Sequence, residues 1–164
     1  MSDQESLNVQ PDETVSTLDV RVIVERESTH LLLLPITARI GEFAGLPGNW
    51  DADDADPITS PAVAGAINLI MLVASPPEAI RDVTPRLAIP TTSSPLPDGG
   101  IQVEWSGNAD RIDVQIGPDG SLGYLVKWGG GSEARYEETD EATVERIIEL
   151  IHQVIWPRLS ARRG

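Results

Sequence analysis

The stretch from Ile101 to Trp128, IQVEWSGNADRIDVQIGPDGSLGYLVKW, decides the fold of this chain. Apolar and polar residues alternate in three runs, at 101–105, 112–116 and 122–128. A period of two is typical of strands with one buried and one solvated face. Because short turns rich in glycine, aspartate and asparagine join the runs, the sequence predicts an antiparallel β-meander with one face open to water.

A helix is predicted before this meander, over residues 60–74. Ser60 can cap it and Pro61 suits its first turn, while the following serine and two prolines end it. Apolar residues form a broad surface along its length, so we expect it to be well buried. After it, Leu87–Ile89 is predicted as a short strand that leads into a loop over 90–100.

A second helix is predicted after the meander. A glycine-rich loop at 129–132 leads to a continuous apolar stripe between Val144 and Ile155. Thr139 or Asp140 can cap this helix, and acidic residues near its start and arginines beyond its end suit the helix dipole. The two amphipathic helices would pack on one face of the meander, which predicts an α+β fold, a two-layer sandwich.

The segment before residue 45 is expected to contain two short strands and a short helix. Apolar and polar residues alternate from Leu18 to Val24, which predicts the first strand. Pro35 would break a helix that passed through it. The apolar run at 31–34 is therefore predicted as the end of a second strand, and residues 36–44 as a short helix.

The length of 164 residues suits a single domain. Residues 17–160 are expected to form this α+β domain. Residues 1–16 have few apolar groups and no periodicity, so an acidic, disordered N-terminal tail is predicted there. Residues 161–164 form a basic C-terminal end.

Charge and composition exclude several classes of function. The chain has 26 acidic and 12 basic side chains, a formal net charge of −14 and a pI near 4.3. Direct binding to nucleic acid or to an anionic membrane is therefore disfavoured. The chain has no cysteine and only two histidines, which excludes thiolate and multi-histidine metal centres. No secretory pattern and no membrane-length apolar run is present, which predicts a cytoplasmic protein.

Four aspartates lie within six residues: Asp51, Asp53, Asp54 and Asp56. Closely spaced carboxylates occur in calcium sites, but the EF-hand pattern fails because Ala55 and Ala62 stand at ligand positions. A solvated acidic loop is the favoured interpretation. As a metal site for hydrolysis the cluster is weak, because a flexible loop offers no preorganised partners.

Other candidate groups have structural interpretations. Glu104 neighbours Trp105, but strand alternation turns its carboxylate to water if the indole faces the core. His30 and His152 have no neighbours that suggest a triad or a metal pair, and His152 is expected at the border of the last apolar stripe. The Gly129–Gly131 run lacks the lysine of a phosphate-binding loop. Core anchoring is expected for the four tryptophans, Trp50, Trp105, Trp128 and Trp156.

Two segments resemble a family of small uncharacterised bacterial proteins. Residues 48–60 are similar to that family's NWDGYGA-x-PIS segment, and residues 95–105 to its P-x-PDGGI-x-LEW segment. The Ala52-Asp53-Asp54 stretch stands where the family pattern has glycine and an aromatic residue. The resemblance implies a bacterial, cytoplasmic setting and carries no particular activity.

The leading hypothesis is a non-enzymatic, acidic protein-binding domain for a basic protein partner. Such a domain could be an antitoxin or inhibitor, a chaperone-like adaptor, or a component of a phage or defence locus. No catalytic residue, metal or cofactor is assigned, and a homo-oligomer is compatible with the sequence. Two alternatives stay open: a metal-dependent hydrolase that uses the 51–56 aspartates, and a nucleic-acid mimic. The predicted partner-binding residues are Trp50, Asp51, Asp53, Asp54 and Asp56.

Overall fold

The computed structural model describes residues 17–74 and 88–155, with side chains from residue 28 onward. Within these ranges the chain forms α1 (Thr17–Phe43), α2 (Ser60–Ala74), β1 (Thr92–Pro95), β2 (Ile101–Ser106), β3 (Arg111–Ile116), β4 (Leu122–Trp128), β5 (Arg135–Thr139) and α3 (Val144–Ile155). The predicted tail, the basic C-terminal end, the stretch after α2 and Trp156 lie outside the described residues.

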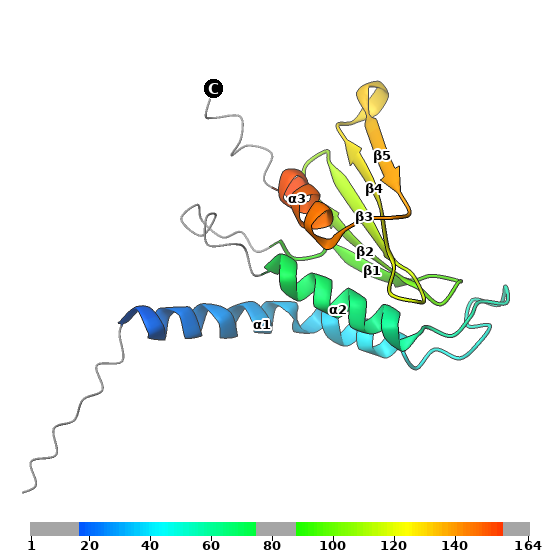
Figure 1. Ribbon diagram of the computed structural model, residues 1–164, viewed down its shortest axis with the longest axis horizontal. Coiled ribbons are helices and arrows are strands. Elements are labelled where there is room, and N and C mark those ends of the chain that lie inside the picture. Colours follow the sequence, from blue (N-terminus) through cyan, green and yellow to red (C-terminus); the bar gives the residue numbers. More distant parts are fainter. Residues whose placement is uncertain (1–16, 75–87, 156–164) are drawn as a thin grey trace, which may run out of the picture.

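The predicted meander is confirmed and forms the centre of a five-stranded antiparallel sheet. The strands follow the order β1-β2-β3-β4-β5, so each strand pairs with its neighbour in sequence (Figure 1). Pairing places Val103, Val114 and Tyr124 in one row, and all three are buried. Every second residue of β2 is buried, as the alternation predicts. Burial of this apolar face supplies much of the hydrophobic stabilisation.

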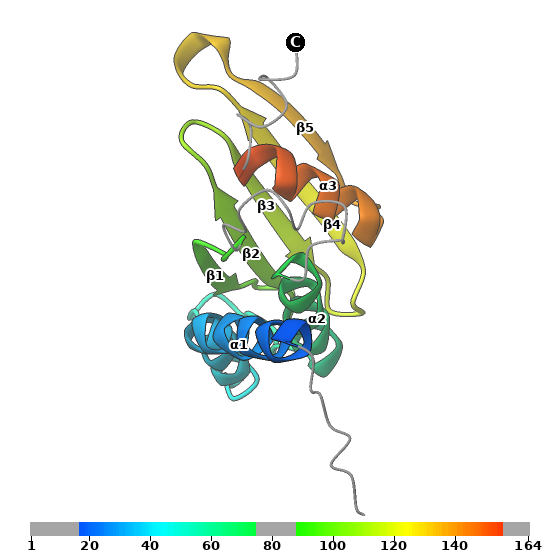
Figure 2. The same ribbon diagram turned by 90° about the vertical axis from the view of Figure 1, so that its left-hand side faces the viewer.

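The helices α2 and α3 cover this apolar face, which confirms the α+β class (Figures 1 and 2). The helix α3 contacts β2, β3 and β4, and α2 contacts β2 and β3. The two helices also contact each other. The third helix, α1, lies beside α2 and reaches the edge strand β1. No described helix packs on the opposite face of the sheet.

The segment predicted as two strands and a short helix is one continuous helix, α1. Both strand predictions, for 18–24 and for the run that ends at Leu34, are therefore wrong. Leu33, Ile40 and Phe43 are buried, and their spacing of seven and three residues belongs to one helix face. Pro35 lies on the exposed side, so packing of the buried face outweighs its missing N–H. In the described ranges, no helix combines the length and apolarity of a membrane span.

The two edge strands lie outside the predicted meander. β1 starts at Thr92, inside the predicted 90–100 loop, and pairs with β2. Ala88 and Ile89 belong to no strand, so the prediction of a strand there is wrong, and Leu87 lies outside the described residues. β5 intervenes between the glycine-rich loop and α3. Both edge strands are short and polar, so they lack the alternation that reveals a half-buried strand.

A threonine directly before the first helical residue caps α2 and α3. Thr59 Oγ1 accepts a hydrogen bond from the N–H of Ala62 at 3.2 Å. Thr143 Oγ1 accepts one from the N–H of Arg146 at 3.2 Å. Each bond satisfies an N–H that has no partner inside the helix. These caps replace the predicted ones, Ser60, Thr139 and Asp140.

Candidate functional site

The loop between α1 and α2 is ordered by its own hydrogen bonds. Asp51 Oδ1 accepts bonds from the N–H groups of Asp53 (2.9 Å) and Ala55 (3.2 Å). Asn49 Oδ1 accepts one from the N–H of Asp54 at 2.9 Å, and the N–H of Asn49 donates to the carbonyl of Ala55 at 2.7 Å. The loop therefore carries its own bracing, because its polar side chains fold back onto its backbone.

Three residues of this loop have left-handed backbone conformations. The φ angles are +60° at Asn49, +68° at Ala52 and +63° at Asp54. Asparagine and aspartate tolerate this region, whereas alanine is strained in it. Glycine adopts this conformation without strain, so the backbone at positions 52 and 54 favours glycine.

The loop docks onto the turn between β1 and β2. The N–H of Asp56 donates to the carbonyl of Pro97 at 2.7 Å, and the N–H of Thr59 to that of Gly99 at 3.0 Å. A Cβ at Gly99 would lie 2.8 Å from the carbonyl oxygen of Pro57, and φ there is +87°, so this close approach requires glycine. Residues 56–59 and 97–99 therefore meet in space and brace each other.

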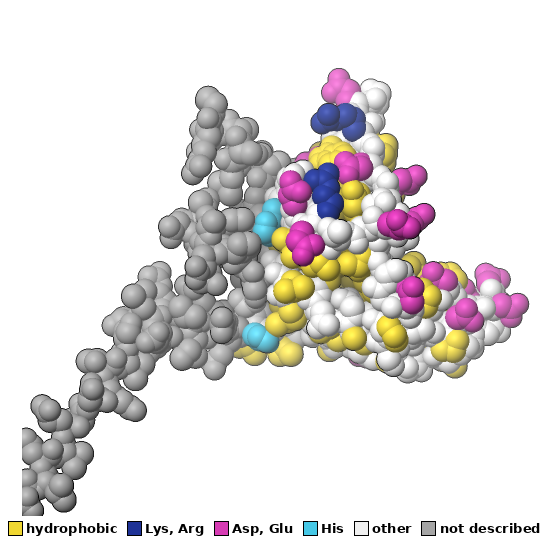
Figure 3. Space-filling model, viewed as in Figure 1, with side chains coloured by type: hydrophobic (Ala, Val, Ile, Leu, Met, Phe, Trp, Pro, Cys, Tyr) yellow, Lys and Arg dark blue, Asp and Glu magenta, His cyan; other side chains and the backbone are white. Residues whose placement is uncertain are grey.

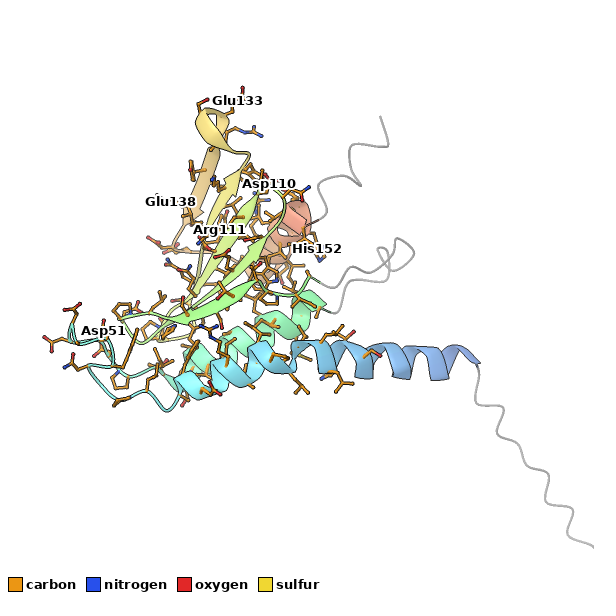
Figure 4. All side chains as sticks on the ribbon, turned by 180° about the vertical axis from the view of Figure 1, so that it is seen from behind. Asp51, Asp110, Arg111, Glu133, Glu138 and His152 are labelled. Carbon is orange, nitrogen blue, oxygen red and sulfur yellow. The ribbon has the colours of Figure 1, made fainter. Side chains whose placement is uncertain are left out.

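The predicted partner-binding residues are brought together at this end of the molecule. Trp50 is half-buried, and its Nε1 donates to the carbonyl of Asp56 at 3.2 Å across the loop. Asp53, Asp54 and Asp56 are exposed, and no hydrogen bond or ion pair in the described structure uses their carboxylates. Asp51 lies on the same loop, at the tip farthest from the projecting half of α1 (Figure 4). Three unengaged carboxylates are thus held on a braced backbone.

Neighbouring turns extend this negative surface. Thr59 Oγ1 donates to the carbonyl of Pro118 at 2.6 Å, which holds the β3–β4 turn against the loop. Exposed Asp119 sits in this turn, and a hydrogen bond from Ser121 lowers the pKa of its carboxyl. Acidic side chains crowd this end of the molecule, at the right of Figure 3. We define the acidic end as Asp51, Asp53, Asp54, Asp56, Asp98 and Asp119.

No basic side chain balances the acidic end locally. The three segments that form it, residues 44–59, 96–100 and 117–121, contain no lysine and no arginine. A depression beside them is lined by the acidic residues Asp98 and Asp140, together with Gln115, Pro118 and Ser121. Clustered charge of one sign on a braced surface attracts groups of opposite charge.

The carboxylates of the acidic end do not form a metal centre in this structure. Among the described residues, no group of three or more His, Asp or Glu side chains is placed to hold one ion. One carboxylate oxygen of Asp51, Oδ1, already accepts two backbone N–H groups. The loop geometry therefore gives no support to the hydrolase alternative.

Trp105 is fully buried and donates from Nε1 to the carbonyl of Ala88 at 3.0 Å, so its expected role as a core anchor is confirmed.

A separate ionic cluster lies on the opposite face of the sheet, where no described helix packs. Glu104 lies on this face, as alternation predicts, but its side chain is only 14% exposed. The guanidinium of Arg111 pairs with both acids of this cluster: Nη2 lies 3.1 Å from Oε2 of Glu104, and Nε lies 2.9 Å from Oδ1 of the buried Asp113. One guanidinium thus pairs with two carboxylates, and this arrangement is structural.

A second network joins β4, β5 and α3. Tyr124 donates from its hydroxyl to Glu137 at 2.6 Å, and Arg146 donates to the same oxygen at 3.0 Å. These bonds lower the pKa of the Glu137 carboxyl and raise those of Tyr124 and Arg146. Sequence analysis missed this network because the three residues belong to different elements and no spacing pattern links them.

The remaining candidates hold structural positions. His30 is exposed on α1, and His152 is partly buried on α3, as expected for a border residue (Figure 4). Burial lowers the pKa of His152. Gly129 and Gly131 have φ angles of +73° and +63°, and the N–H of Gly129 donates to Asp110 at 2.7 Å. The glycine run therefore turns β4 toward β5 through a short 3₁₀ helix at Gly131–Glu133, and no phosphate-binding lysine accompanies it.

Comparison with known proteins adds no assignment to this site. No protein-family model, no curated protein and no solved structure matches the chain. The resemblance of residues 48–60 and 95–105 to a bacterial family therefore stays a prediction. The acidic end, with its carboxylates and its contacts, carries the functional argument alone.

Proposed function

We propose that the protein is a non-enzymatic binding domain that presents its acidic end to a basic protein partner. The observation that carries this proposal is the braced loop at 49–56, whose three exposed carboxylates engage no group in the described structure. A surface that is already ordered loses little conformational entropy on binding, which favours affinity. Half-buried Trp50 adds an aromatic group at the same place, and such groups are enriched at binding hot spots.

The charge distribution supports a basic partner. Residues 1–164 carry a net charge of −14, and the three segments of the acidic end contain acids without bases. Opposite charges steer association and raise its rate, and this effect weakens as salt increases. An antitoxin or inhibitor, an adaptor, or a phage or defence component would each use such a surface.

Affinity capture with a charge-matched control tests the proposal. The wild type is immobilised beside the triple variant Asp53→Asn, Asp54→Asn, Asp56→Asn. The control, Glu133→Gln, Glu138→Gln, Glu141→Gln, removes the same charge from exposed carboxylates outside the acidic end. We expect the wild type and the control to retain a basic protein from the source organism, at a level that falls with salt, and the loop variant to lose it.

Other outcomes would contradict the proposal. Equal retention by all three proteins would mean that the acidic end is not the contact surface, and retention of nothing by the wild type would remove the proposed partner. Calorimetry with calcium, magnesium and manganese addresses the hydrolase alternative. A heat of cation binding that the wild type and the control show and the loop variant lacks would indicate a cation site on the loop. Release of the captured protein by duplex DNA would favour nucleic-acid mimicry.

A further inference from the structure

The two edges of the sheet differ in what covers them. The edge strand β1 contacts α1 and ends in Pro95, which has no N–H to offer. The other edge strand, β5, contacts β4 and no other described element. Figure 1 shows β5 at the outer border of the sheet, with no helix or strand beyond it. One edge of the sheet is therefore covered, and the other is open.

The outer edge of β5 carries unpaired backbone groups. In an antiparallel pair, a strand directs only about half of its N–H and C=O groups at its neighbour. For residues 135–139 that neighbour is β4, and the described structure contains no further backbone hydrogen bond at any of them. The strand has no proline and no glycine, and it spans about 17 Å. These features make β5 a template with which another extended chain can pair.

Two side chains of β5 lie unengaged on the open face of the sheet, the face on which no described helix packs. Pairing places Glu138 in one row with Leu125, Asp113 and Glu104, the row of the ionic cluster (Figure 4). Tyr136 shares this face, because side chains two residues apart in a strand point the same way. Tyr136 is 63% exposed, and the Glu138 carboxylate takes part in no hydrogen bond or ion pair of the described structure.

Charge decides which kind of chain suits this edge. Residues 133–141, which comprise β5 and its flanks, contain five acids and one arginine, a net charge of −4. A second copy of β5 would set these acids against each other, and like charges directly opposite destabilise a sheet. A segment rich in lysine or arginine would set opposite charges there, which stabilises the pairing. The edge thus disfavours another copy of itself and favours a basic strand.

We propose that β5 is a docking edge for an extended, basic segment of another protein, which adds to the sheet as a further strand. Main-chain hydrogen bonds to the outer edge of β5 hold the segment. Because side chains alternate between faces, every second residue of the segment lies on the open face, beside Tyr136 and Glu138. A lysine or arginine there pairs with the Glu138 carboxylate and lays its aliphatic stem on the Tyr136 ring. This edge is separate from the acidic end, so the proposal goes beyond the binding function proposed above.

Nuclear magnetic resonance of the isotope-labelled full chain with a short peptide tests strand addition. The probe is acetyl-Lys-Val-Lys-Val-Lys-Val-amide, and its control carries an N-methyl group on every backbone nitrogen, which keeps the charge and removes the N–H donors. We expect the probe to slow amide hydrogen exchange at residues of β5 whose N–H groups face outward, and not in β1. The N-methylated peptide should bind at least about tenfold more weakly, because it cannot donate to the edge.

Three outcomes of this experiment would overturn the proposal. Equal binding of the two peptides would mean that charge alone attracts them. Protection outside β5 would place the peptide elsewhere. Protection of β5 that grows with protein concentration and needs no peptide would make a second copy the occupant.

Charge reversal tests the part that Glu138 plays. Glu138→Lys should weaken binding of the probe about fivefold, since it sets like charges opposite each other in the new pair. Glu42→Lys makes the same change in net charge at an exposed position of α1, which does not contact β5, and should leave the affinity unchanged in physiological salt. An equal loss in both variants would show attraction to the whole negative protein and would overturn the proposal.

The acidic end can be tested separately from this edge. The variant Asp53→Asn, Asp54→Asn, Asp56→Asn changes no residue of β5 and should bind the probe as the wild type does, whereas loss of binding would place the site at the acidic end. In affinity capture, a protein lost only with Glu133→Gln, Glu138→Gln, Glu141→Gln would bind at β5, and one lost only with the aspartate variant would bind at the acidic end. Failure of either proposal therefore leaves the other standing.

Discussion

At the scale of single residues, backbone strain is stored in the loop that forms the acidic end. Ala52 has a φ of +68°, a conformation that costs an L-residue with a Cβ about 1–2 kcal/mol. Neighbouring Asp54 shares this conformation, at +63°. The hydrogen bonds to Asp51 and Asn49 hold the loop in shape against this cost.

Replacing the strained alanine by glycine should therefore stabilise the protein. For Ala52→Gly we expect a free energy of unfolding higher by about 0.5–1 kcal/mol, since the strain relieved exceeds the added entropy of the unfolded chain. Urea denaturation measures it. Ala134→Gly is the control: its φ is −63°, so only the entropy term acts and stability should fall by a similar amount. A loss of stability in both variants would show that position 52 is not strained.

Titration of two side chains should make stability depend on pH in two steps. Burial lowers the pKa of His152 below its usual 6.5, so the unfolded chain takes up a proton first and stability falls as pH drops below about 6.5. Bonds from Tyr124 and Arg146 lower the pKa of Glu137 below its usual 4.5, so its contribution is lost at still lower pH. Unfolding midpoints across pH should lose the first step in His152→Gln and the second in Glu137→Gln. An unchanged profile in either variant would refute that assignment.

At the scale of elements, α1 shows how an apolar pattern can mislead. In the 31–36 stretch, Leu33 and Ile36 face the core, whereas the apolar side chains at 31, 32 and 34 are exposed. Apolar residues therefore surround the helix there, and no single apolar face dominates. By contrast, α3 has one stripe, with Ile147, Leu150, Ile151 and Val154 buried, and its prediction is confirmed.

Pro35 lies inside α1 and offers a test of the continuity of this helix. A proline inside a helix removes one hydrogen bond and crowds the preceding turn, at a cost of about 3 kcal/mol. Pro35→Ala should raise the free energy of unfolding by about 1–3 kcal/mol, because the helix already spans this position. Thermal unfolding followed by circular dichroism measures the change. Destabilisation would mean that the helix ends at residue 34, as the sequence pattern suggested.

At the scale of the whole molecule, the excess of negative charge opposes folding and serves recognition. A net charge of −14 destabilises the compact state through self-repulsion, which salt screens. Three unengaged carboxylates crowded on one loop repel one another and lower the stability of the fold. Such a cost is expected where a surface is kept for function and not for stability. This makes the acidic end a place where stability and function can be separated by measurement.

Neutralising the loop should leave the fold as stable as before or more so. For Asp53→Asn, Asp54→Asn, Asp56→Asn we expect the free energy of unfolding at low salt to rise by up to about 1 kcal/mol, because repulsion is relieved and no described contact is lost. The gain should shrink at high salt. Urea denaturation at two salt concentrations measures both effects. A marked loss of stability would show that these carboxylates hold the loop together.

The sequence by itself determined the meander, the helices α2 and α3, the fold class and the acidic loop. Each of these follows from a local pattern, because alternation or a single stripe maps directly onto one buried face. Only the tertiary structure decided the rest: the continuity of α1, the polar edge strands, and the contact between the Trp50 loop and the Gly99 turn. Those features depend on pairing between distant residues, and no local pattern records which distant groups will satisfy a backbone N–H or cover a leucine.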